Sequence, residues 1–410
     1  MRERRIVITG LGVIAPNGIG KEAFWDALKE GRSGIRPVKR FDTGGFKCKL
    51  AGEIEGFMPE RFLGAKGLRN LDRSSRLLCS AAKLAIDDAG LKIDDGNTDD
   101  IGVCTGTTLS SLWSIAEFDK EIIEEGPLFT NAALFPGTVI NAASSQVSIF
   151  FNIQGFNTTV STGYSSSLDA LKYAVDFIRM GRIKAVLVGG VESLSLANFT
   201  GFNSLGFFSG TSGEALSCPF DKRRDGIILG EGAAVAVIED EEYAHNRKAR
   251  VYGEIKGMCS SFDAFKIGRY NPVAEGLKKS MKKALMNSGL DISEIDHISA
   301  SANSVPDQDR LESEAIKGVF GRLGYNIPVS SIKSMIGETF SAGGLMQVAA
   351  SAGSIAHNFV PPTINYKFRD DDCDFDCVEN KFRISRINNV LVNNFGPGGG
   401  SASVVISKYH

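Results

Sequence analysis

The chain has 410 residues, of which 43% are hydrophobic, so it can bury a large core in two domains or one large double domain. Its 46 basic and 48 acidic side chains leave a net charge of −2, which argues against nucleic acid or an anionic membrane as a partner. No apolar run approaches the roughly 20 residues that span a bilayer, and the N-terminus lacks the apolar core of a signal peptide. We therefore expect a cytoplasmic protein.

Strands and helices alternate along the first part of the chain. Near-continuous apolar runs there predict strands that are covered on both faces, and the helical segments carry apolar residues at helical spacing. In chain order we predict a strand over 5–10, a loop over 12–20, helices over 21–30 and 75–90, and strands over 101–108, 185–193 and 233–240.

The same alternation begins again after about residue 250. The predicted elements are a strand over 251–258, a helix over 276–287, and strands over 296–303, 388–396 and 401–408. No Pro-rich or Ser-rich linker separates the two stretches. We therefore predict an α/β fold of two similar halves, residues 1–250 and 251–410, packed as one body.

Two segments resemble ligand sites, and we interpret both as structural. Cys373 and Cys377 lie in the acidic stretch DDDCDFDC, but no second pair of soft ligands follows at zinc spacing, so we expect a solvated loop and no metal. The glycine-rich segment 393–403 lacks the phosphate-loop pattern and lies between two predicted strands, which favours a tight hairpin. No cofactor is predicted.

A bend at Tyr164, in NTTVSTGYSSSLDALKYAVDF (157–177), has the form of an approach to a catalytic nucleophile: small residues, then a helix. Further motifs accompany it, among them RRIVITGLGVIAPNGIG at the start, CPFDKRRDGIILGEGAAVAVIE (218–239) and SIKSMIGETFSAGGL (331–345). In this order they make the whole chain resemble a β-ketoacyl-acyl-carrier-protein synthase of the thiolase fold, nearest the type II enzymes. The resemblance implies two α/β halves in α-β-α-β-α layers.

The resemblance also identifies the catalytic positions, and none is intact. Members of the family place a cysteine at the bend, where the helix lowers its pKa, and two histidines that assist decarboxylation of malonyl-carrier protein. The corresponding residues here are Tyr164, Ser301 and Glu338, whereas the accompanying Lys333 and Glu312 are retained. A neutral phenol, a hydroxyl and an extra anion do not support a condensation that develops negative charge.

Other family positions have changed as well. The two threonines that hold the pantetheine arm in the family correspond to Asn303 and Val305. The segment that forms the gate of the acyl tunnel contains Phe395, Pro397 and Gly398, with proline in place of the usual phenylalanine. These replacements indicate a site that is no longer used for condensation.

Condensation-dead relatives in this family are chain-length factors, which pair with an active ketosynthase in polyketide, polyene or fatty acid biosynthesis. The resemblance therefore implies a heterodimer with an active ketosynthase, which acyl carrier protein reaches through the complex. The segment 131–146 matches the family's dimer boundary and tunnel wall, and its apolar residues Leu134, Phe135, Val139 and Ile140 either meet the partner or belong to the core.

Three other functions remain open from the sequence. The alternatives are a stand-alone acyl-binding pseudoenzyme, a malonyl-carrier-protein decarboxylase, and a hydrolase or ester-forming transferase that uses Ser165 or Ser301. The decarboxylase lacks both histidines, and the hydrolase lacks a base beside its hydroxyl.

Overall fold

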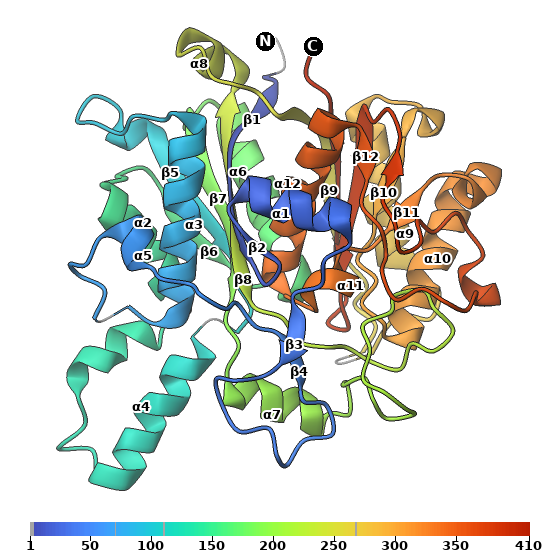
Figure 1. Cartoon of the computed structure of the whole chain (residues 1–410). Helices are drawn as coiled ribbons and strands as arrows, with labels where there is room; N and C mark the ends of the chain where they lie inside the picture. The colour runs from blue at the N-terminus through green and yellow to red at the C-terminus, as the bar shows by residue number, and fades with distance from the viewer. Residues whose placement is uncertain (1–3, 70, 110, 267–268) are drawn as a thin grey trace.

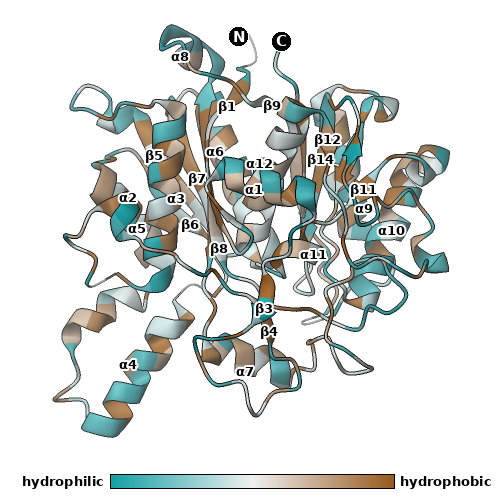
Figure 2. Ribbon diagram, viewed as in Figure 1, coloured by the Kyte–Doolittle hydropathy of each residue, from teal (hydrophilic) through white to brown (hydrophobic). Residues whose placement is uncertain are grey.

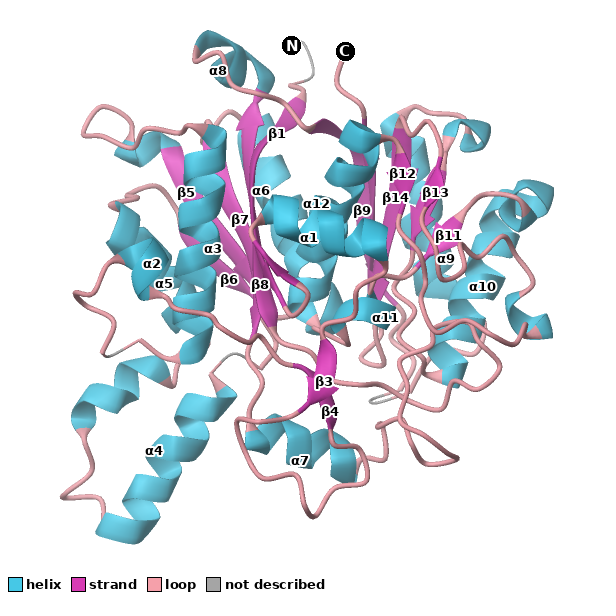
Figure 3. Cartoon of the chain, in the orientation of Figure 1, coloured by secondary structure: helices cyan, strands magenta, loops and turns pink. Residues whose placement is uncertain are grey.

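A mixed eleven-stranded sheet runs through the chain, with helices on both of its faces (Figures 1 and 3). The computed structural model describes residues 4–69, 71–109, 111–266 and 269–410. In the first half the strands of this sheet are β1 (Ile6–Ala15), β2 (Gly18–Ile19), β5 (Ile101–Gly106), β6 (Asn157–Val160), β7 (Ala185–Glu192) and β8 (Gly232–Asp240). In the second half they are β9 (Gly253–Phe262), β10 (His297–Ser299), β11 (Val329–Ser330), β14 (Asn389–Phe395) and β15 (Gly400–Ser407).

The pairing of the strands repeats between the halves. The order β6-β5-β7-β8-β1 in the first half corresponds to β11-β10-β14-β15-β9 in the second. In both, the second strand is parallel to its two neighbours, and the remaining pairs are antiparallel. The halves join where β1 pairs with β9, at Val7–Glu254 and Ile8–Gly253. The two similar α/β halves are therefore confirmed, while the domain boundary at residue 250 stays a prediction.

Helices form one layer between the halves and two outer layers. The inner helices are α6 (Ser166–Arg179) and α12 (Ser341–His357), which contact each other; α12 also contacts strands of both halves. On the outside, α3 (Arg73–Ala89) packs on β1 and β8, and α9 (Glu275–Ser288) packs on β9 and β15. This is the α-β-α-β-α layering predicted from the resemblance.

The remaining elements are shorter or lie at the periphery. The other helices are α1 (Lys21–Glu30), α2 (Glu60–Leu63), α4 (Leu112–Glu125), α5 (Ala142–Phe151), α7 (Leu196–Ser204), α8 (Glu241–Asn246), α10 (Pro306–Phe320) and α11 (Lys333–Ile336). The 3₁₀ turns are η1 (Thr98–Asp100), η2 (Ala132–Gly137), η3 (Gly163–Ser165), η4 (Ile292–Glu294), η5 (Gly321–Tyr325) and η6 (Asp371–Cys373). Two small sheets pair β3 (Ile35–Pro37) with β4 (Leu50–Gly52), and β12 (Phe359–Val360) with β13 (Arg383–Ile384).

Hydrophobic residues are concentrated in the strands, whereas the peripheral helix α8 is hydrophilic (Figure 2). Within the described residues, no helix has both the length and the apolar character that crossing a bilayer requires. Close backbone packing sets the helix positions: a Cβ on Gly106 at the end of β5 would lie 2.3 Å from the backbone nitrogen of Ser167. Glycine at this position therefore lets the first turn of α6, and the bend before it, press against the sheet.

Three sequence predictions were wrong in their details. The first strand does not end at residue 10: β1 continues through the predicted loop to Ala15. The glycines that suggested a loop instead allow close packing against α3, where a Cβ on Gly12 would lie 1.9 Å from the carbonyl oxygen of Ala81. The strand predicted over 296–303 is paired only from His297 to Ser299.

Cys373 and Cys377 do not lie in a solvated loop. Their exposed fractions are 0% and 6%, and both belong to the hydrophobic core of the second half. The acidic residues between and before them suggested solvent exposure, but thiols pack as small apolar groups even when their neighbours along the chain face water. Burial also raises the pKa of the Cys377 thiol to about 12, which keeps it protonated at neutral pH.

Candidate functional site

Tyr164 lies in the 3₁₀ turn η3, directly before the inner helix α6. The turn requires a positive φ of 85° at Gly163, and the Ser166 hydroxyl donates a hydrogen bond to the Gly163 carbonyl. The predicted bend before a buried helix is therefore present, and Tyr164 is 8% exposed.

The ring of Tyr164 occupies the centre of the site. It meets Phe340 edge to face, with ring centroids 5.1 Å apart, and Phe340 stacks on Phe202 at 4.9 Å. A Cβ on Gly396 would lie 2.6 Å from Cγ of Tyr164, so the ring packs directly on the backbone of the gate segment. Burial, together with the charge of nearby Glu338, raises the pKa of the Tyr164 phenol well above its usual value of 10. The phenol is therefore a neutral group at physiological pH.

A buried ion pair lies beside this ring. Lys333 at the start of α11 and Glu338 have no exposed side-chain surface, and Nζ lies 2.8 Å from Oε2. The Asn303 amide donates to the same Oε2 at 2.7 Å, and the Phe340 backbone N–H donates to Oε1 at 2.7 Å. The Lys333 ammonium also lies 5.8 Å from the ring centroid of Tyr164. The anion at position 338 is thus fully neutralised and hydrogen-bonded.

Ser301 is tied to the backbone on both of its sides. Its own N–H donates to Oε1 of Glu312 at 2.9 Å, and its Oγ accepts the N–H of Phe395 at 3.2 Å. The Gln308 amide donates to the Ser301 carbonyl at 3.2 Å and lies 3.3 Å from Oγ. The Ser301 hydroxyl donates to the Phe395 carbonyl at 3.3 Å, and Lys333 Nζ, which is paired with Glu338, lies 3.5 Å from Oγ. No carboxylate or imidazole among the described residues accepts the hydroxyl, so the geometry provides no free base for a serine nucleophile.

Gln308 and Tyr270 belong to the same network, and the sequence analysis missed both. Oε1 of Gln308 accepts hydrogen bonds from the Tyr270 hydroxyl and, at 3.2 Å, from the Asn303 amide. These contacts connect the segment before α9 to the ion pair through Asn303. The only available signal is the position of Gln308 in the first turn of α10, behind Pro306, which does not reveal the direction of its side chain.

The structure brings most of the predicted residues together. Tyr164, Ser301, Glu338, Lys333 and Asn303 form one buried cluster. Glu312 stands behind Ser301, while Val305 packs at the rim of the aromatic cluster and donates its N–H to Asn303.

The three residues of the predicted gate differ in how exposed they are. Phe395 is 4% exposed, Pro397 is half-buried and Gly398 is exposed in the turn between β14 and β15. The hairpin predicted for 393–403 is therefore confirmed. His297, the histidine nearest the site in sequence, faces away: it is buried against Ser330, at 3.0 Å, and burial lowers its pKa to about 3.

The apolar residues of segment 131–146 are not core residues of the isolated chain. Leu134, Phe135, Val139 and Ile140 expose 40%, 58%, 43% and 40% of their surface. They lie on and just after η2, which contacts α4 and α5. The alternative that these side chains are buried in this chain's own core is therefore wrong.

Two buried carboxyls of α10, Glu312 and Asp309, lie close to the cluster, where they accept the backbone N–H groups of Ser301 and Asn303. Burial raises the pKa of Glu312 to about 7 and that of Asp309 to about 6. Oε2 of Glu312 is buried and has no hydrogen-bond partner among the described residues. Across the same residues, no group of three His, Cys, Asp or Glu side chains is arranged to hold a metal ion.

Two family models match the chain. The Beta-ketoacyl synthase N-terminal domain matches residues 3–244, and the Beta-ketoacyl synthase C-terminal domain matches residues 252–367. The chain is 37% identical to 3-oxoacyl-(acyl-carrier-protein) synthase 2 of Coxiella burnetii, over 100% of this chain and 99% of the relative. It is 34% identical to the tetracenomycin polyketide synthase ketoacyl synthase alpha subunit of Streptomyces glaucescens, over 99% and 97% of the two chains.

Solved structures share the whole fold. A chain of the ishigamide ketosynthase/chain length factor superposes with a TM-score of 0.94 at 32% identity, over 100% of both chains. A chain of the AntDE:AntF complex, a type II polyketide synthase acyl-carrier protein with its ketosynthase bound to the hexaketide, gives a TM-score of 0.92 at 28% identity, again over 100% of both.

The ion pair yields a test by double-mutant cycle. Lys333→Met and Glu338→Gln each leave one buried charge without its partner, so each should lower the free energy of unfolding by about 3–5 kcal/mol. The double variant leaves neither charge unpaired and should lose much less than the sum of the two. Urea unfolding of the four proteins measures these losses, and strictly additive losses would contradict the assignment of a coupled pair.

Glu312 yields a test by pH. Because its pKa is raised in the folded chain to about 7, its contribution to stability is fully present below its unfolded value of 4.5 and is lost as the pH rises toward 7. The stability advantage of Glu312→Gln over wild type should therefore grow from about pH 4.5 to about pH 7, by on the order of 2–3 kcal/mol, and then stay constant. Urea unfolding across this range measures it, and Asp307→Asn, with a side chain 73% exposed on the same helix, is the control. A constant difference between Glu312→Gln and wild type would contradict the assignment.

Proposed function

Because this chain belongs to the β-ketoacyl synthase family, we propose that it acts as a condensation-deficient subunit of the chain-length-factor kind, paired with an active ketosynthase. The observation that carries the proposal is the state of the three catalytic positions. Ser301 and Glu338 form one buried cluster with Lys333, against the ring of Tyr164, and no side chain of this cluster is placed to serve as nucleophile or base.

The chemistry of that cluster opposes each step of a condensation. Acyl transfer needs an ionised or activated nucleophile, but the Tyr164 phenol has a raised pKa and lies against Phe340. Decarboxylation needs donors that stabilise an enolate, whereas Glu338 is an anion already held by Lys333. The relatives named as synthases support the family of this chain, and its own site residues argue that it does not share their reaction alone.

A partner is supported by the exposed apolar surface around η2. Leu134, Phe135, Val139 and Ile140 form an uncovered patch of the kind that marks protein interfaces. The structural match to a ketosynthase/chain length factor is consistent with an active ketosynthase as the partner. We expect an obligate interface that buries more than about 2,000 Å². Acyl carrier protein would reach the active subunit of this complex, in the cytoplasm, without a cofactor held by this chain.

The alternative activities gain no support from the site. A decarboxylase would need a positive group free to meet the malonyl carboxylate, but the ammonium of Lys333 is already paired with Glu338. A stand-alone acyl-binding protein would need space for the acyl chain near the bend, where the Tyr164 ring packs on the backbone of Gly396. The gate and pantetheine roles of the family positions remain part of the proposal.

The first test restores the missing thiol. The purified Tyr164→Cys variant, incubated with acyl- and malonyl-carrier protein, should form no β-ketoacyl product, because both histidine positions still lack a donor. Mass spectrometry of the carrier protein measures the product, and the active ketosynthase that copurifies with the chain is the positive control. Product formed by Tyr164→Cys alone would show that the remaining cluster suffices for condensation and would end the proposal.

The second test concerns chain length. Phe135→Ala shortens a side chain that is 58% exposed beside Phe118, at the surface assigned to the partner's tunnel. In the reconstituted pair this change should alter product length and leave the condensation rate within about twofold, because the reacting groups lie on the other subunit. Ile384→Ala, 82% exposed on β13, is the matched control. Product length that is the same for both variants and wild type would reject the role of this surface.

A further inference from the structure

Helix α4 and the turn η2 form an arm, residues 112–137, that projects from the body of the chain (Figure 1). At its base the Ser114 hydroxyl donates to Oδ2 of Asp72, in the body of the chain, at 3.3 Å. Within the arm the rings of Phe118 and Phe135 lie 5.8 Å apart and join α4 to η2. The far end of α4 and the segment that follows extend beyond these contacts.

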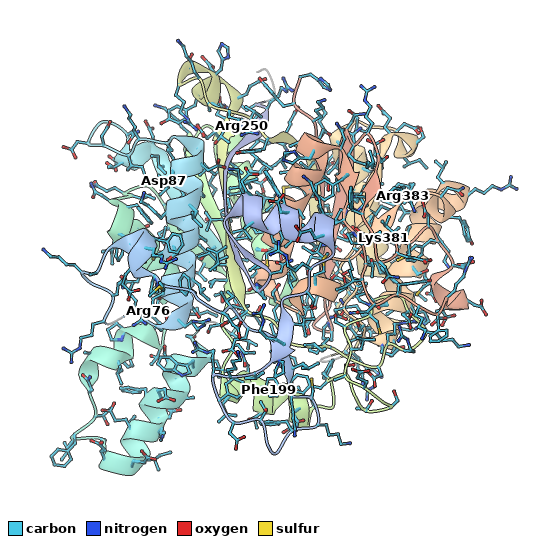
Figure 4. The ribbon with its side chains drawn as sticks, in the orientation of Figure 1. Arg76, Asp87, Phe199, Arg250, Lys381 and Arg383 are labelled. Atoms are coloured by element: carbon cyan, nitrogen blue, oxygen red, sulfur yellow. The ribbon has the colours of Figure 1, made fainter. Side chains whose placement is uncertain are left out.

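The arm is strongly acidic. Its one cation is Lys120, whose ammonium lies 4.0 Å from a Glu124 carboxylate oxygen. Its carboxylates are Glu117, Asp119, Glu121, Glu124 and Glu125. Near the base, Glu117 lines a cavity together with Arg69 and Arg76. Figure 4 labels Arg76 at the end of α3 nearest the arm. The excess negative charge therefore gathers at the far end.

The negative side chains at the far end of α4 are unfavourable for the C-terminus of a helix. The last turn of a helix carries the negative pole of the helix dipole, which favours cations and disfavours carboxylates. Glu124 and Glu125 occupy the last turn of α4, which contains no basic residue. In addition, Oε2 of Glu121 is buried without a hydrogen-bond partner in the described part of the chain. A cationic surface against this end would relieve the exposed carboxylates of Glu124 and Glu125.

The same end is apolar and uncovered. Ile123, Leu128 and Phe129 expose 82%, 91% and 76% of their surface. The segment 126–168 contains no Lys, Arg, Asp, Glu or His, although 23% of the whole chain is charged. This uncharged segment continues through α5 to β6, the last strand of the sheet. An acidic helix end is therefore followed along the chain by an uncharged segment whose first residues include the exposed Leu128 and Phe129.

We propose that this arm docks on a surface of the partner ketosynthase that is apolar at its centre and cationic at its edge, and that the acidic end selects that partner over a second copy of this chain. The inference rests on the proposed function. A two-fold contact between identical chains places the same surface on both sides. Such a contact would bring the carboxylates of two arms to one interface, with Lys120 as the arm's own cation on each side. A different chain can supply the missing cations.

The test reverses the charge at the arm's end. The triple variant Glu121→Lys/Glu124→Lys/Glu125→Lys should bind the copurified ketosynthase with an association rate lowered about tenfold or more at about 50 mM salt. Most of the difference should vanish at about 500 mM salt, where surface charges are screened. The triple glutamine variant at the same positions keeps the helix neutral and should give an intermediate rate. Association kinetics on the immobilised ketosynthase measure all three proteins.

A matched control separates the arm from net charge. Glu22→Lys/Asp26→Lys/Glu30→Lys makes the same change on the exposed face of α1 and should leave the association rate within about twofold of wild type. Equal slowing by both lysine triples, or no slowing by the arm variants, would overturn the inference while the proposed pairing stands. A wild-type chain that binds no ketosynthase and forms a stable homodimer instead would overturn both.

Discussion

A lysine and a glutamate without exposed surface face each other at the positions where the family resemblance predicts catalytic groups. Removing two charges from water costs several kcal/mol each, so the pair is tolerated only if its remaining hydrogen-bonding positions are filled. Asn303 and the backbone of Phe340 fill them for Glu338, and the ring of Tyr164 lies near Lys333. The arrangement is self-sufficient, and a substrate carboxylate or thioester would have to displace it.

The function proposed for the chain follows from that constraint. Because the buried site is neutralised and tightly packed, the subunit would contribute to catalysis through its surface and not through its interior. The surface agrees with this view: apolar side chains of the uncharged segment, among them Leu128, Phe129 and Phe135, are exposed next to the acidic end of α4. The thiolase-like core then serves to hold these elements in position.

The sequence predicted the two-half fold and the main members of the cluster, because motif order fixes which strand ends meet. It did not predict Gln308 or Tyr270, since the direction in which a helix-start amide or a loop phenol folds back depends on tertiary packing. Local composition misled twice: glycines in β1 suggested a loop where they permit close helix packing, and acidic neighbours suggested solvent around the buried Cys373. Charge at the end of α4 was visible in the sequence, but its exposure was not.

The central claim is that acyl chemistry takes place on the partner and not on this chain. Intact-mass measurement of each subunit, after the copurified pair has been incubated with acyl-carrier protein alone, tests it most directly. We predict an acyl adduct on the active ketosynthase and an unchanged mass for this chain, because Tyr164 is a buried neutral phenol. An acyl adduct on this chain, lost in a Tyr164→Phe variant and discharged by malonyl-carrier protein, would contradict the account.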